Sequence, residues 1–138
     1  MDEDITAEQV RPRWFINLDW FQQNNRSFSA LAQSCSCPKC RERLKGEISA
    51  ADLLTTIKDC CSKEPGFITG ELPVLECIFR LFLANGNQPL DVEELGEQLS
   101  EWRGGDTYHT SAEILSRLLS SDQYYGLRQV QESGEVDS

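Results

Sequence analysis

The hydrophobic pattern of the chain predicts a buried helix near its middle. The segment "PVLECIFRLFLA", residues 73–84, is apolar around nearly its whole circumference, which is typical of a helix enclosed by other elements. Pro73 suits a first helical position because no hydrogen-bond donor is needed there, and Asn85-Gly86 suits the turn just past the end. We therefore expect a buried central helix.

Two amphipathic helices and a strand are expected after the central helix. The segment "DVEELGEQLSEW" opens with Asp91 and Glu94 in capping-box spacing, and its apolar stripe consists of Val92, Leu95 and Leu99. The segment "TSAEILSRLL" repeats this arrangement with Thr110 and Glu113, and its expected inward positions are Ile114, Leu115, Leu118 and Leu119. The closing "YYGLRQV" is aromatic and β-branched enough to predict a strand.

The first half of the chain predicts two shorter helices and an aromatic cluster. One helix is expected at 27–34, capped by Asn25 or Ser27, and another at 49–60, before Pro65-Gly66 ends the segment. Between residues 14 and 28 lie five aromatic side chains, namely Trp14, Phe15, Trp20, Phe21 and Phe28. We expect them to form the core of a small first module, and the alternative is an exposed hot spot for a partner.

Charge divides the chain into two segments of opposite sign. Residues 11–45 hold seven basic and two acidic side chains, a net charge of +5, whereas residues 71–130 hold four and ten, a net charge of −6. We therefore expect an aromatic- and cysteine-rich module at 11–66 and a second module at 71–130. The polar, acidic ends, residues 1–10 and 131–138, are expected to be disordered tails.

Composition also bears on the function classes. The sequence contains no apolar run of the roughly 20 residues that a membrane helix needs, and its start, "MDEDITAEQ", is acidic where a signal peptide is basic. We therefore expect a cytoplasmic protein with no membrane contact. Because the sequence has no Gly-rich phosphate loop, no serine nucleophile motif and one histidine, we expect neither an enzyme nor a small-molecule substrate.

The segment "CSCPKC" at 35–40 carries the clearest chemistry. In a reducing compartment its cysteines favour metal binding over disulfides, and the two-residue spacer between Cys37 and Cys40 lets both sulfurs face one ion. Our first choice of ligands for a structural zinc adds Cys60 and Cys61. Neighbouring residues of an intact helix point about 100° apart, so Cys35 is the alternative fourth ligand. Thiol redox chemistry is the alternative function of the cluster.

The remaining candidate ligands are expected to play no part in this site. Cys77 lies within the apolar central helix and is expected to be a small buried hydrophobe, and a ligand role for His109 is not expected.

A basic stretch overlaps the cysteine segment. Its side chains, Lys39, Arg41, Arg43 and Lys45, offer a path for a phosphate backbone, with Trp14, Trp20 or Phe28 available for base stacking if exposed. The alternative is a solvated charged face that balances the acidic segment.

The order of elements in residues 71–130 resembles a winged helix-turn-helix. More specifically, "FLANGNQPLDVEELGEQLSE" followed by "TSAEILSRLLSSDQYYGLRQV" is similar to the HARE-type winged helix family, which includes the amino-terminal domain of the RNA polymerase delta subunit. The sequence departs from that pattern because no second wing strand is evident after Val130. The resemblance implies a role in the transcription machinery, whereas residues 1–70 resemble no family.

Together these features predict a mainly α protein, with a winged-helix-like carboxyl-terminal domain and a small, cysteine-rich, zinc-bound helical module. We expect a non-catalytic adaptor that binds a protein or nucleoprotein assembly, with RNA polymerase as a candidate partner. Nucleic-acid binding through the basic zinc module is the first alternative function, and a thiol redox protein is the second.

Overall fold

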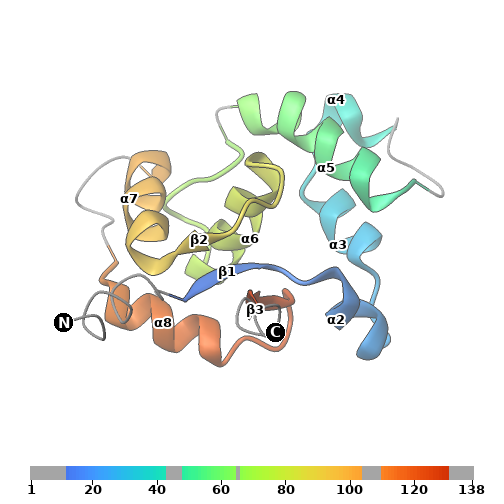
Figure 1. The fold of residues 1–138 in the computed structure, drawn as a ribbon. Helices are drawn as coiled ribbons and strands as arrows, with labels where there is room; N and C mark the ends of the chain where they lie inside the picture. Colours follow the sequence, from blue (N-terminus) through green and yellow to red (C-terminus); the bar gives the residue numbers. More distant parts are fainter. Residues whose placement is uncertain (1–11, 43–47, 65, 104–109, 131–138) are drawn as a thin grey trace.

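The fold comes from a computed structural model, which describes residues 12–42, 48–64, 66–103 and 110–130. The predicted central helix is present as α6 (Val74–Ala84; Figure 1). Six of its residues, which lie around most of its circumference, are buried: Cys77, Ile78, Phe79, Leu81, Phe82 and Leu83. Pro73 is the residue before the helix, with φ −58° and ψ 150°, and not the first helical residue as predicted. The chain is mainly helical, as expected.

A three-stranded antiparallel sheet joins the two ends of the described chain. Its strands are β1 (Arg13–Ile16), β2 (Leu90–Asp91) and β3 (Leu127–Gln129), in the order β2-β1-β3. Trp14 lies opposite both Leu90 and Gln129. The middle strand therefore comes from segment 11–66, while both outer strands come from segment 71–130.

Two helices follow β2, and their caps lie close to the predicted positions. At the start of α7 (Val92–Arg103) the Glu94 N–H donates to the Asp91 carboxylate at 2.9 Å and the Asp91 N–H donates to the Glu94 carboxylate at 3.0 Å, which confirms the capping box. At α8 (Ala112–Ser120) the cap is Ser111, one residue after the predicted Thr110.

The predicted inward face of α8 needs one correction. Leu115 and Leu119 are fully buried, but the Ile114 side chain, which was expected to face inward, is 45% exposed. Ile114 is exposed because α7 and β3 cover only one side of this nine-residue helix, and the Ile114 position lies outside the covered side. The α8 surface therefore includes an exposed apolar residue.

The first half of the chain folds as short helices. These are α2 (Leu18–Gln23), which was not predicted, then α3 (Phe28–Ser34), α4 (Pro38–Arg41), α5 (Ala50–Asp59) and the 3-10 turn η1 (Cys61–Lys63). The cap of α3 is Ser27, whose hydroxyl accepts the Ala30 N–H at 3.0 Å, whereas Asn25 lies in a left-handed turn with φ 59°. Ser49 caps α5 in the same way.

The aromatic cluster of residues 14–28 lies in the hydrophobic core. Trp14, Trp20, Phe21 and Phe28 are each less than 10% exposed, which confirms the core interpretation for four of the five aromatics, whereas Phe15 is only partly buried. Phe28 meets Phe79 of α6 with ring centroids 6.3 Å apart, so the core of the first half continues into that of the second. Base stacking on Trp14, Trp20 or Phe28 is therefore contradicted, because their rings are already covered.

Strand β1 crosses the molecule beside α6, with α7 and α8 at one end and α2 and α3 at the other (Figure 1). The two expected modules thus share one sheet and one hydrophobic core. Within the described ranges, no helix is both long and apolar enough to cross a membrane.

Candidate metal centre

Four thiols converge at the junction of α4, α5 and η1. The sulfurs of Cys37, Cys40, Cys60 and Cys61 all lie within 4.8 Å of one another. Zinc–thiolate bonds of about 2.3 Å in a tetrahedron place the sulfurs about 3.8 Å apart. The Cys37 and Cys60 sulfurs are 3.8 Å apart, and the Cys40 and Cys60 sulfurs are closer, at 2.6 Å. The mutual proximity of the four sulfurs is compatible with a bound metal ion, although the Cys40 and Cys60 sulfurs lie closer together than a zinc tetrahedron would hold them.

Local backbone geometry brings the two neighbouring cysteines to the same site. The helix α5 ends at Asp59, Cys60 leaves helical geometry with φ −120° and ψ −64°, and η1 begins at Cys61. The 100° separation that an intact helix would impose therefore does not apply. Both sulfurs can face the Cys37–Cys40 pair, so the four-thiol set of the sequence prediction is the one that the fold gathers.

Cys37 and Pro38 determine the other half of the cluster. Cys37 is the residue before α4 and Pro38 occupies a first-turn position, which needs no amide donor. The Cys37 amide is free to donate to the Cys61 sulfur, at 3.1 Å. Amide donors of this kind favour the thiolate form that metals bind.

The remaining candidate ligands lie elsewhere. Cys35 is buried but stands outside the four-sulfur group, with its sulfur 4.0 Å from the Ser34 hydroxyl. Cys77 is fully buried in α6, and its thiol donates to the Thr69 carbonyl at 3.5 Å. His109 falls outside the described residues. Cys77 thus behaves as the predicted buried hydrophobe.

The electrostatics of the cluster disfavour a free reactive thiolate. Hydrogen bonding to the Cys40 thiol raises the pKa of Cys60 to about 11, and burial raises the pKa of Cys61 to about 12. Reactive redox thiols instead have pKa values below the ordinary one. A dication among the sulfurs would reverse this direction, because it stabilises thiolates. The raised pKa values therefore disfavour a redox nucleophile at this cluster.

One anchoring residue next to the cluster was not predicted. Arg80 of α6 donates to the Phe67 carbonyl at 2.9 Å and forms an ion pair with Glu76 at 2.8 Å. Arg80, Phe67 and two of the cluster thiols, Cys37 and Cys61, line one cavity of about 300 Å³. Arg80 thus fixes the segment after η1 against the central helix.

The predicted basic stretch is only partly described. Lys39 and Arg41 lie on α4, the same short helix as Cys40, while Arg43 and Lys45 fall outside the described residues.

Comparisons of this chain with protein-family models, with curated proteins and with solved structures find no match.

Proposed function

We propose that the four-thiol cluster holds a structural zinc ion. Soft thiolates select zinc, copper(I) and iron–sulfur clusters among common metals, and a closed set of four sulfurs is typical of structural zinc. The observation that carries this proposal is the mutual proximity of the sulfurs, all within 4.8 Å, in two segments 20 residues apart. Bound zinc would join α4 to the end of α5, and such sites add on the order of 10 kcal/mol to folding.

Elemental analysis tests the zinc proposal directly. The full chain purified without added metal is expected to contain about one zinc ion, and Cys40→Ser is expected to lose it. Cys77→Ser is a matched control, since that thiol lies in the core but outside the cluster. A protein that is folded and free of metal would refute the proposal.

We further propose that residues 71–130 act as a winged-helix-like docking domain. The order of α6, α7, α8 and β3 matches the helices and strand on which the sequence resemblance rests, and the short strand β2, which was not predicted, lies between α6 and α7. The antiparallel neighbour of β3 is β1, with Ile16 opposite Leu127. Strand β1 thus takes the position beside β3 that a second wing strand would occupy.

An acidic ridge on α7 favours a basic protein partner. Glu93, Glu97 and Glu101 are exposed and follow one another at four-residue intervals, which places them along one face of the helix. Such a row of carboxylates attracts cationic surfaces and repels phosphate. We infer that the protein is a non-catalytic adaptor in which α7 contacts a basic surface of a transcription assembly.

The exposed face of α8 supports an adaptor over a DNA reader. A recognition helix offers basic and amide side chains to base edges. The exposed positions of α8 and its cap instead carry one base, one acid, one large apolar residue and three serines: Arg117, Glu113, Ile114, Ser116, Ser120 and the cap residue Ser111. Affinity for phosphates would be small, because one basic residue releases few counterions.

The adaptor proposal is tested with purified RNA polymerase, the partner suggested by the resemblance. Wild-type protein is expected to co-elute with the polymerase in gel filtration at about 0.15 M salt, and the triple change of Glu93, Glu97 and Glu101 to Gln is expected to abolish co-elution. The single change Glu113→Gln, on α8, is the matched control. Undiminished binding by the triple variant would contradict the role of α7.

A second candidate function is nucleic-acid binding through the basic segment. The observation that favours it is the position of Lys39 and Arg41 on α4, directly beside the cluster ligand Cys40. If this function is correct, binding of a single-stranded oligonucleotide should weaken when both residues are changed to Gln. The slope of log K against log salt concentration should then fall by about 0.7 for each phosphate that the variant no longer neutralises.

A further inference from the structure

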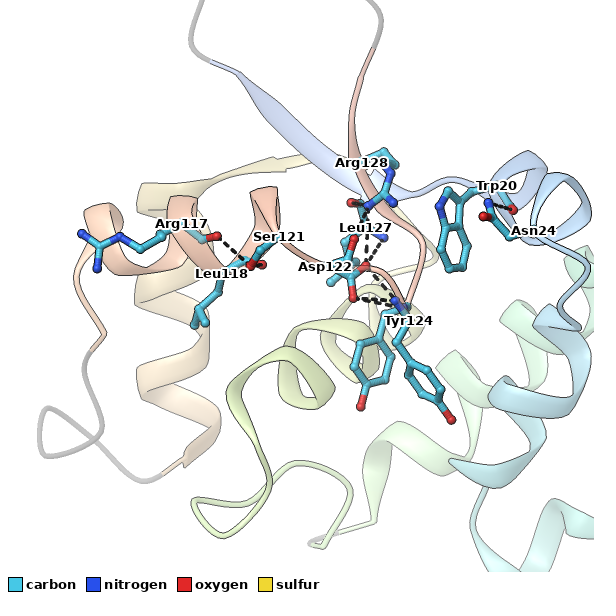
Figure 2. Close-up of polar contacts among 10 residues, drawn as sticks. Trp20, Asn24, Arg117, Leu118, Ser121, Asp122, Tyr124, Leu127 and Arg128 are labelled. Carbon is cyan, nitrogen blue, oxygen red and sulfur yellow. Dashed lines mark hydrogen bonds and ion pairs between the residues drawn. The ribbon is translucent and has the colours of Figure 1, made fainter.

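A second site lies on the side of the molecule away from the thiols. A pocket of about 490 Å³ is lined by Trp20, Asn24, Arg26, Gln123 and Arg128. These residues come from α2 and the turn after it, from the turn between α8 and β3, and from β3 itself. Figure 2 shows the Trp20 indole between the side chains of Arg128 and Asn24. The pocket therefore brings two arginines together against one aromatic ring.

Arg128 is held in position by the backbone and by Trp20. Its Nη1 donates to the Asp122 carbonyl at 2.9 Å and to the Leu127 carbonyl at 2.7 Å, and its Cζ lies 5.1 Å from the centroid of the Trp20 ring (Figure 2). Both of these bonds use Nη1. In the described part of the chain, Nε and Nη2 of Arg128 make no hydrogen bond, so one edge of the guanidinium remains for a ligand.

Arg26 approaches the same ring, and no acidic partner for it lies among the described residues. Its Cζ lies 5.9 Å from the Trp20 centroid and 4.9 Å from the Tyr124 centroid. Among the described residues its side chain interacts only with these two rings, and no carboxylate is paired with it. Stacking fixes the plane of a guanidinium while its N–H groups stay available at the edge.

The nearest carboxylate does not neutralise both arginines. An oxygen of Asp122 lies 3.7 Å from Nη1 of Arg128. That carboxylate is buried and accepts the amide N–H groups of Tyr124, Tyr125 and Leu127 (Figure 2). Among the described residues this carboxylate is paired with Arg128 alone, so it offsets one of the two positive charges. Two cations sharing one ring repel each other unless an anion lies between them.

We propose that this pocket binds the phosphate group of a small phosphomonoester. The N–H groups along the edge of a planar guanidinium can donate to phosphate oxygens, and two guanidinium groups together match the charge of a phosphate dianion. A nucleic acid is the less favoured source of phosphate, because a chain with a formal net charge of −10 repels a polyanion at range. Asn24 and Gln123 add amide groups that can bond hydroxyls of the ligand.

The neighbouring surface can accept the organic part of such a ligand. Arg26 also lines an adjoining cavity of about 290 Å³, where Phe21, Leu31 and Tyr124 provide apolar contacts. Tyr124 is half exposed, so a flat ring can reach it. A nucleoside monophosphate combines a dianionic phosphate with a flat ring, and it is the probe that matches both cavities.

The test uses the full, zinc-loaded chain and three ligands in about 0.15 M salt: adenosine monophosphate, adenosine and inorganic phosphate. Binding is followed by amide chemical shifts of residues 24–26 and 123–128. We expect adenosine monophosphate and phosphate to shift these resonances and adenosine to leave them unchanged. Arg26→Gln should weaken adenosine monophosphate binding by about tenfold or more, since it removes charge-assisted hydrogen bonds.

Two controls separate the proposal from an effect of overall charge or folding. Arg117→Gln removes the same charge from an exposed position of α8 outside the pocket and should leave binding unchanged. Arg128→Lys keeps the charge but loses the planar edge, and it should weaken binding in a protein whose other resonances are unmoved. Equal weakening by Arg117→Gln, equal binding of adenosine, or tighter binding of a single-stranded oligonucleotide would each overturn the proposal.

Discussion

The side chain of Asn87 connects the two halves of the chain, and its removal should be costly. Its Oδ1 accepts the Ile16 N–H at 2.8 Å, and its Nδ2 donates to the Ile16 carbonyl at 2.9 Å. One amide side chain thus bonds β1 as the backbone of a neighbouring strand would. Ile16 is fully buried and Asn87 is partly buried, so shortening the Asn87 side chain leaves two poorly solvated backbone groups without their partner.

The magnitude of the effect follows from these contacts. Replacing Asn87 with Ala removes two hydrogen bonds worth about 1 kcal/mol each and leaves two enclosed polar groups, for a loss of roughly 2–3 kcal/mol. The backbone at Asn87 has φ 65°, and this left-handed conformation costs Ala about 1 kcal/mol more. The expected loss of about 3–4 kcal/mol corresponds to a fall in Tm of roughly 10–15 °C for a domain of this size.

Urea unfolding of the zinc-loaded protein, followed by tryptophan fluorescence and by circular dichroism, measures this loss. Asn87→Gly should be about 1 kcal/mol more stable than Asn87→Ala, because glycine adopts the left-handed conformation without cost but still lacks the two hydrogen bonds. Gln88→Ala is the matched control, since only the backbone of Gln88 is bonded to Asn85 and its side chain is exposed. A loss below about 1 kcal/mol for Asn87→Ala would refute the assigned role.

Three further predictions concern other positions. Cys35→Ser should leave the zinc content at one ion per chain, because its sulfur stands outside the cluster; elemental analysis showing less would restore Cys35 as a ligand. Asp122→Asn should lower the free energy of unfolding by about 2–3 kcal/mol in urea melts, because an amide N–H would oppose the Leu127 N–H; an unchanged midpoint would contradict this. Gly126→Ala should destabilise the protein far more than Gly86→Ala in the same assay, since both have positive φ but an added Cβ at Gly126 would lie 2.6 Å from the Phe21 ring; similar losses would mean that the ring yields to the added methyl group.

The sequence alone determined most of the helices, because their signals are local. Ser27, Ser49 and the Asp91–Glu94 pair each cap a helix through hydrogen bonds between residues three apart, so both partners of each bond can be recognised in a short stretch of sequence. The four cysteines were also within reach, since the short spacing of Cys37 and Cys40 predicts half of a metal site. The backbone geometry at Cys60 could not be predicted from the sequence, because it depends on where helix α5 ends.

The way in which the two halves join depends on contacts between residues far apart in the sequence. Strand β1 is four residues long, and its partners lie more than 70 residues away, so no local pattern marks it as the middle of a sheet. No local pattern brings Arg26 and Arg128 together either, because these two arginines lie far apart in the sequence and meet only over the Trp20 ring. Local sequence signals specify helices, whereas strand pairing and the contact of two arginines with one tryptophan ring depend on long-range contacts that form only when the chain folds.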